Sequence, residues 1–279
     1  MCIFVASHAE RMPQRHKRVG DYYYLFGMTR LYKYLDVNGG LKMLEHHNLQ
    51  FTNATKFNDP FDCHPALFDY SHIPERPYNW PPADFLSSKG ENDMEDLRNR
   101  TWICCLSKVY NSLLMWAYYN NHKGICIGLN KKAVLKCCQY KFFGLMSPLA
   151  GDVKYKNILQ KPDYFKDHPS WGDLLLTKAE AWKHEQEVRL ITKDPAWVHV
   201  GRDIPEELKK DKEVDWKEIR YYLPLSRDCF ESVYLGVNIL PRNKSKIIKF
   251  AKNLSPNIEI YQILTDPDVF ELKAELVNI

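Results

Sequence analysis

The chain has 279 residues, of which 13% are aromatic, so it is neither disordered nor collagen-like and can bury a sizeable core. Its 39 Lys and Arg exceed its 35 Asp and Glu by only four, a net charge too small to indicate a dedicated nucleic-acid binder.

The sequence lacks the glycine-rich loops that hold phosphates in many nucleotide-binding proteins. It has 12 Gly and contains neither G-x-G-x-x-G nor G-x-x-x-x-G-K. A nucleotide would therefore have to be held by side chains in a shaped cleft.

Cysteine usage and the apolar segments indicate a cytoplasmic protein. The eight Cys form no C-x-x-C pair, so we expect reduced and mostly buried thiols rather than a zinc ribbon or a disulfide scaffold. The apolar segment 2–6 is too short for the core of a signal peptide, and no apolar run approaches membrane-spanning length. We expect no membrane partner.

In chain order, residues 1–29 are expected to form a basic and aromatic extension, and residues 30–279 a single domain. The domain begins with a predicted strand over 30–34. Leucines at helical spacing then predict a helix from about residue 41, which leads into a strand over 49–52.

The middle of the domain mixes predicted strands and helices. The apolar run TWICCLS predicts a buried strand over 101–107, followed by a short helix over 113–118 and a strand over 125–129. Residues 174–182 are predicted to be helical. Alternation of polar and apolar residues predicts a strand over 187–192 with one solvated face.

The end of the domain reads as strand, helix, strand. We expect strands over 232–239 and 258–264, a helix over 241–253 between them, and a final strand over 270–277. Residues 202–220 carry charges of both signs, which is typical of a solvated helix or loop. Irregular alternation without a repeat indicates a mixed α/β or α+β domain.

The first segment with chemical content is W-K-H-E-Q-E-V-R at 182–189. In a strand, alternate residues share a face, so Glu185, Glu187 and Arg189 would lie on one side. The two carboxylates are compatible with an acid and base, a metal pair, or a charged edge strand held by salt bridges.

The second segment is F-N-D-P-F-D at 57–62. Asn and Asp around a Pro most often form a turn, because their side chains accept nearby N–H groups. We expect Phe57 and Phe61 to anchor this turn in the core, which would give its acidic groups a rigid position.

The third segment is M-W-A-Y-Y-N-N-H-K-G at 115–124. Trp116 and Tyr119 are three residues apart on the predicted helix, a spacing usually found in a core. His122 is a candidate base or ligand donor, although a His before a Gly more often caps a helix or faces solvent.

Several of these segments together resemble a bacterial and phage family labelled only as a domain of unknown function. The motifs occur in order over about residues 30–240, and F-N-D-P-F-D and M-W to H-K-G are the most specific. The motifs are LYKY (31–34), FTNATKFNDPFD (51–62), CCLS (104–107), MWAYYNNHKG (115–124), W-x-x-E-x-E-x-R (182–189) and YLG (234–236).

Three short strings also resemble the ADP-ribosyltransferase superfamily. Its members open with Leu-Tyr-His or Leu-Tyr-Arg, carry a Ser or Tyr on a middle strand, and place a catalytic Glu, sometimes in E-x-E, on a later strand. These are matched in order by Leu31-Tyr32-Lys33, by Ser107 and by the pair Glu185 and Glu187, with Lys33 in place of the usual His or Arg. The resemblance implies a single α+β domain with mixed and antiparallel sheets and flanking helices.

The resemblance also implies a role for each residue, with NAD as substrate. Glu187 would stabilise the oxocarbenium-like species formed when nicotinamide leaves, and Glu185 would polarise the acceptor. Ser107 is the third catalytic candidate and, with Lys33, would bind the ribose and the phosphates. The other cofactor-binding candidates, as stacking rings or cleft walls, are Tyr32, Tyr34, Asn58, Asp59, Trp116, Tyr119 and His122.

We therefore expect an NAD-dependent ADP-ribosyltransferase or NAD glycohydrolase. It would act as a bacterial or phage toxin or defence effector on a protein or nucleic-acid acceptor, with an antitoxin or defence-system protein as a further partner.

Two alternatives from other classes stay open. One is a metal-dependent nuclease or phosphoesterase, because Asp59, Asp62, Glu185 and Glu187 offer the oxygen ligands that Mg²⁺ or Mn²⁺ prefers. The other is a non-enzymatic binding module in which the motifs only determine the fold.

Overall fold

The structure is a computed structural model that describes residues 29–73, 75, 82–141, 149–193, 217 and 220–278. Nearly all of the expected extension 1–29 and of the charged stretch 202–220 lies outside these residues. The described part has mixed helices and sheets, which confirms the predicted α+β class.

The main sheet has ten strands in the described residues, with β12-β11-β10-β4-β1-β3-β2-β9 as its main path. Strand β8 pairs with β3 and also with β5. The β10–β11 pair is parallel and the others are antiparallel. The strands are β1 (Arg30–Leu35), β2 (Asn48–Asn53), β3 (Thr101–Ser107), β4 (Ile125–Asn130), β5 (Leu149–Asp152), β8 (Glu187–Lys193), β9 (Tyr221–Pro224), β10 (Phe230–Leu235), β11 (Glu259–Thr265) and β12 (Leu272–Leu276).

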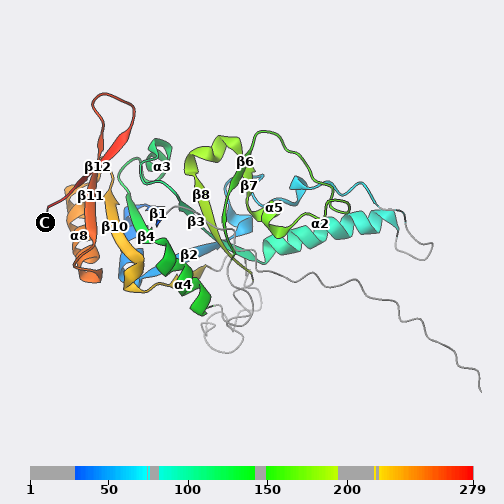
Figure 1. Ribbon diagram of the computed structural model, residues 1–279, viewed down its shortest axis with the longest axis horizontal. Coiled ribbons are helices and arrows are strands. Elements are labelled where there is room, and N and C mark those ends of the chain that lie inside the picture. Colours follow the sequence, from blue (N-terminus) through cyan, green and yellow to red (C-terminus); the bar gives the residue numbers. More distant parts are fainter. Residues whose placement is uncertain are drawn as a thin grey trace, which may run out of the picture.

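Helices lie around this sheet, and a parallel pair, β6 (Lys154–Lys156) and β7 (Thr177–Ala179), forms a second small sheet. In Figure 1, α8 lies beside β11 at one end, and α2, α5, β6 and β7 gather at the other. The helices are α1 (Val37–His46), α2 (Ala83–Asn99), α3 (Leu113–Tyr118), α4 (Lys131–Lys141), α5 (Trp171–Leu175) and α8 (Pro241–Leu254), with 3-10 turns η1 (Ala54–Lys56), η2 (Pro65–Leu67), η3 (Glu180–Glu185) and η5 (Arg227–Cys229).

Two expectations for the segment before and within β8 are wrong. The helix predicted over 174–182 ends at Leu175, and β7 and η3 follow it. The strand predicted with a solvated face is instead buried at every position from Glu187 to Thr192. Its polar residues are tolerated inside because Glu187 and Arg189 form an ion pair with each other.

Strands β1 and β2 diverge beside β3, and the space between them positions the candidate site. Strand β1 pairs with β3 only at Tyr32–Ser107, and β2 pairs with the same edge of β3 at Ile103 and Trp102. Between these pairings, the edge of β3 around Cys105 faces a gap between β1 and β2. Lys33 crosses this gap, its Nζ donating to the Cys105 carbonyl at 2.8 Å.

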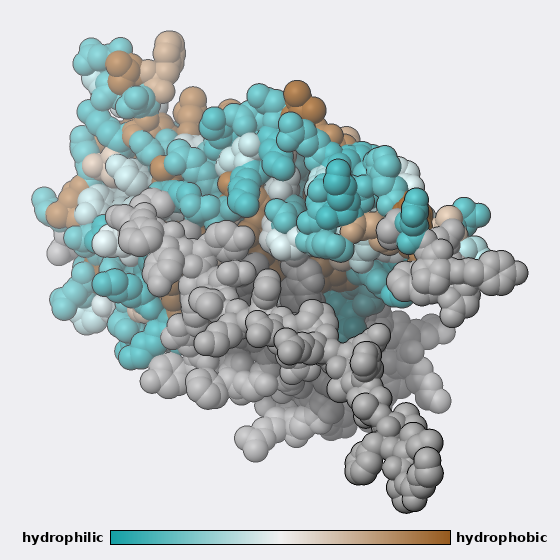
Figure 2. All heavy atoms as spheres, turned by 45° about the vertical axis from the view of Figure 1, so that its right-hand side comes forward, coloured by the Kyte–Doolittle hydropathy of each residue, from teal (hydrophilic) through white to brown (hydrophobic). Residues whose placement is uncertain are grey.

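On the face shown in Figure 2, the described surface is mostly hydrophilic and its apolar side chains form small separate patches. None of the helices in the described residues is long and apolar enough to cross a membrane.

Candidate functional site

A cavity of about 280 Å³ opens where β1 and β2 diverge. Its walls come from these strands, β3, the 57–62 turn, β7 and the η3–β8 junction. The predicted site residues that line it are Tyr32, Lys33, Tyr34, Asn58, Ser107, Tyr119, Glu185 and Glu187.

Three of these residues form a row across neighbouring strands. Tyr32 of β1 lies opposite Ser107 of β3, and Ser107 lies opposite Glu187 of β8. Directly opposed residues of adjacent strands share a face of the sheet. The three sequence strings of the ADP-ribosyltransferase resemblance therefore meet at one place.

Arg189 fixes the position of Glu187, which lines the cavity. Its side chain is fully buried, and its Nε and Nη2 donate to the two Glu187 oxygens at 2.8 and 3.2 Å. Its Nη1 and Nη2 donate to the two Asp62 oxygens at 2.8 and 2.6 Å, and Nη1 also donates to the Leu175 carbonyl at 2.7 Å. All five guanidinium donors are thus satisfied.

Lys178 of β7 is a second buried cation at the site. Its Nζ lies 2.6 Å from Glu185, 3.3 Å from Glu187 and 3.7 Å from Asp62, and it sits 4.9 Å from the ring centroid of Trp182. Three carboxylates therefore share two cations in a largely buried cluster. Each cation offsets the cost of burying the carboxylates it contacts.

The cluster pushes the pKa values of the two glutamates apart. Burial raises the pKa of Glu187, but the charge and hydrogen bonds of Arg189, together with Lys178, outweigh it and lower the pKa to about 2. Burial raises the pKa of Glu185 above its usual value, and Lys178 only partly opposes this. Such a divergence separates a carboxylate that is ionised at neutral pH from one that exchanges a proton more readily.

The E-x-E spacing was expected to place both glutamates on one strand, and this is wrong. Glu185 is the last residue of η3, and Gln186 adopts a left-handed conformation with φ 43° before β8 begins at Glu187. The two carboxylates still meet, because both bind Lys178.

Ser107 supports the corner that carries Glu185. Its Oγ donates to the Glu185 carbonyl at 2.7 Å and accepts from the Val109 amide at 3.2 Å. The hydroxyl is thus bonded to backbone on both sides. Ser107 lines the cavity, but its geometry is that of a residue that positions the η3–β8 junction.

Three predicted site residues do not line the cavity. Trp116 is completely buried, and its Nε1 donates to the Tyr110 carbonyl, so it cannot stack on a ligand. Asp59 is buried in its turn, where its Oδ1 accepts the Phe61 amide at 2.9 Å. His122 lies in a left-handed turn with φ 61°, and its carbonyl accepts from Asn238.

The 57–62 segment forms the expected turn, but only one of its two Phe residues is anchored. Phe57 lies 5.3 Å from the Arg189 guanidinium and covers it. Phe61 is 57% exposed, so the expectation that it enters the core is wrong. Its side chain lines a neighbouring groove instead.

Sequence reasoning missed Lys178 and Tyr155. The Tyr155 hydroxyl accepts the Glu187 amide at 2.8 Å and so helps to place the start of β8. Lys178 fell within a segment predicted to be helical, and nothing in its spacing signals three carboxylate partners. Tertiary packing alone brings β6 and β7 beside β8.

The carboxylates of the metal hypothesis are arranged differently from a metal site. Both Asp62 oxygens bind Arg189, Glu185 and Glu187 bind Lys178, and Asp59 caps its own turn. No group of three or more His, Cys, Asp or Glu within the described ranges has an arrangement that would hold a metal ion.

Comparisons with known proteins bear on the middle of the chain. No curated protein and no solved structure matches the chain. The resemblance to a family of unknown function is confirmed over residues 115–190, from α3 to β8, which match the model of the family described as "Protein of unknown function (DUF2971)".

Proposed function

We propose that this protein cleaves the bond between nicotinamide and ribose in NAD, as an ADP-ribosyltransferase or NAD glycohydrolase. One observation carries the proposal: the first strand, Ser107 and the E-x-E glutamates line a single cavity in which Glu187 is held ionised.

The chemistry needs a fixed negative charge near the ribose. As the bond from the ribose C1′ to nicotinamide breaks, its electron pair leaves with nicotinamide and positive charge develops on the ribose. Glu187, held through both oxygens by Arg189, would stabilise that charge without reorganising. Glu185 would accept the proton of the attacking water or acceptor.

The cavity suits part of the dinucleotide rather than the whole. Its volume of about 280 Å³ is slightly below the roughly 300–1,000 Å³ that is usual for ligand pockets. Nicotinamide and its ribose would occupy it, against the rings of Tyr32 and Tyr119. Lys33, Gln50 and Thr52 add polar groups to the wall.

The direct test is to incubate the purified protein with NAD and measure free nicotinamide, with protein, RNA and DNA added as acceptors. We expect nicotinamide release that EDTA does not inhibit, because the proposed chemistry uses no metal. Absence of both nicotinamide release and a thermal shift with NAD would contradict the proposal. Nucleic-acid cleavage abolished by EDTA would favour the nuclease alternative.

In the cell, an enzyme of this kind would act as a toxin or defence effector of a bacterium or phage, restrained by an antitoxin or defence-system partner. Expression in a bacterial host should then slow growth and deplete NAD, and Glu187→Gln should relieve both effects. Growth inhibition that persists in Glu187→Gln would contradict this role.

A further inference from the structure

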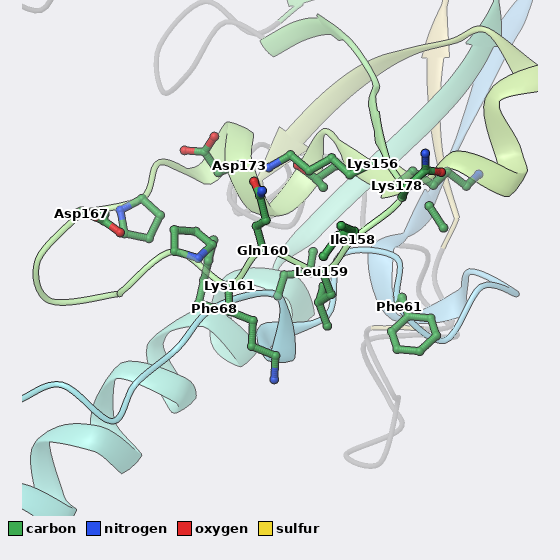
Figure 3. A pocket seen from close by; sticks show the side chains of 16 residues that line it. Phe61, Phe68, Lys156, Ile158, Leu159, Gln160, Lys161, Asp167, Asp173 and Lys178 are labelled. Atoms are coloured by element: carbon green, nitrogen blue, oxygen red, sulfur yellow. The ribbon is translucent and has the colours of Figure 1, made fainter.

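A groove of about 660 Å³ lies directly beside the candidate site. It is lined by the loop after β6, the edge of β7 and the exposed side of the 57–62 turn (Figure 3). Lys178 lines both the groove and the cavity. The two spaces therefore share a wall at the residue that binds Glu185.

The walls of the groove expose large apolar side chains. Phe61 is 57% exposed, Ile158 69% and Leu159 45%. They come from segments about a hundred residues apart but line one groove, as Figure 3 shows. Phe61 also belongs to one of the most specific sequence motifs, although neither the core nor the cavity uses its side chain. Exposed apolar walls of this kind mark an interaction surface.

The charges of the groove argue against a phosphate backbone as its occupant. Lysines and aspartates both line it, whereas nucleic-acid sites concentrate cations. Both aspartates already accept N–H groups, Asp167 from Asp163 and Asp173 from Ser170, while Lys156 is exposed at the rim. These features fit a polypeptide that inserts an apolar side chain and places a carboxylate near Lys156.

From this placement we infer that the groove binds a segment of a protein acceptor, so that the substrate class of the proposed transferase is protein rather than nucleic acid. This inference rests on the proposed function. An acceptor side chain reaching past Lys178 would arrive beside Glu185. Its nucleophilic atom would bond to the ribose C1′, nicotinamide would leave with the electron pair, and the proton would pass to Glu185.

Peptide binding tests the inference without NAD. The probe is a fluorescein-labelled peptide with a Leu-Phe pair flanked by aspartates, measured by fluorescence anisotropy against wild type, Phe61→Ser and Ile158→Ser. We expect about tenfold weaker binding to each variant, and to wild type when Ser-Ser replaces Leu-Phe. Phe270→Ser is the matched control, because Phe270 is fully exposed on the distant β11–β12 loop and should leave binding unchanged.

Three results would overturn the inference: no peptide binding to wild type, unchanged binding to both groove variants, or tighter binding of a single-stranded oligonucleotide of equal length.

The proposed function is tested separately, by nicotinamide release. Peptide binding without nicotinamide release would leave the groove as a protein-docking site and reject NAD cleavage. Nicotinamide release without peptide binding would reject only the groove.

Discussion

Arg189 explains why two of the sequence motifs occur in the same chain. It lies at the end of W-x-x-E-x-E-x-R, and its guanidinium binds both Glu187 from that motif and Asp62 from F-N-D-P-F-D. Phe57, the first residue of the second motif, covers its other side. Asp62 from one motif and Glu187 from the other together provide the carboxylates that allow the Arg189 guanidinium to be buried.

Arg189→Lys should strongly destabilise the protein. A lysine cannot donate to two carboxylates through both oxygens of each, so buried charges would be left without partners. We expect a loss of about 3–5 kcal/mol in the free energy of unfolding, measured by urea denaturation. The control, Arg220→Lys at an exposed position, should change it by less than about 0.5 kcal/mol. Equal stability of the two variants would refute this role of Arg189.

Glu187 should make stability depend on acid pH. Its pKa in the folded state is about 2, below the usual 4.5, so the unfolded chain binds its proton more readily. The stabilisation is therefore present above pH 4.5 and is lost as the pH falls toward 2. Between pH 4.5 and pH 2, we expect the loss of this charge to lower the free energy of unfolding by on the order of 3 kcal/mol.

Urea denaturation at several pH values measures this contribution. The slope of stability against pH between 4.5 and 2 should be shallower in Glu187→Gln than in wild type, even though the variant is less stable throughout. Parallel slopes would show that Glu187 titrates normally in the folded protein.

At the scale of elements, the glycine of the YLG motif allows β10 to end against the turn that follows α3. A Cβ on Gly236 would overlap the backbone carbonyl of His122, and the Gly236 amide donates to the Gly124 carbonyl. This explains why H-K-G and Y-L-G occur together. The backbone of His122 forms this contact, so His122, which was predicted to bind a ligand, helps instead to pack the turn against β10.

Gly236→Ala should therefore lower the melting temperature by several degrees, since a backbone carbonyl cannot move aside cheaply. Gly172→Ala is the control, because a Cβ there meets only Ser170 and Leu176, both at ordinary contact distance. Calorimetry should show little change for the control. A Gly236→Ala variant as stable as the control would contradict the close packing described at this turn.

Sequence patterns predicted the elements whose periodicity is local. The strands containing Arg30, Thr101 and Ile125 follow from apolar and aromatic runs, and helix α8 begins at its Pro241. The helix predicted over 174–182 is wrong because α5 ends at Leu175 and β7 begins two residues later, with no local sequence signal for the change.

The candidate site was predicted in part for the same reason. Tyr32, Ser107 and Glu187 lie on strands whose existence the sequence indicates, and sheet pairing aligns them. Lys178 was not predicted, because the carboxylates that it contacts are brought to it only by tertiary packing. Trp116 was predicted to line the cleft but is buried in the core, because aromatic residues at helical spacing give the same sequence pattern in both places.

In the molecule as a whole, the divergence of β1 and β2 beside β3 determines where the site lies. Strand β3 pairs with β1 and β2 at different positions along one edge and with β8 along the other. The cavity opens at the first edge, and the charged cluster around β8 contributes Glu187 and Lys178 to its wall. The groove beyond β7 adds a second, larger space that shares Lys178 with the cavity.

We propose that Glu187 promotes cleavage of NAD in this cavity. The decisive experiment compares nicotinamide release by Glu187→Gln with release by Glu180→Gln, a matched change in η3 at a residue that pairs with the exposed Lys183. We predict that Glu187→Gln loses about 10²–10³-fold in rate, as when a preorganised electrostatic group is removed, while Glu180→Gln stays near wild type. Equal nicotinamide release by the two variants would contradict this role of Glu187.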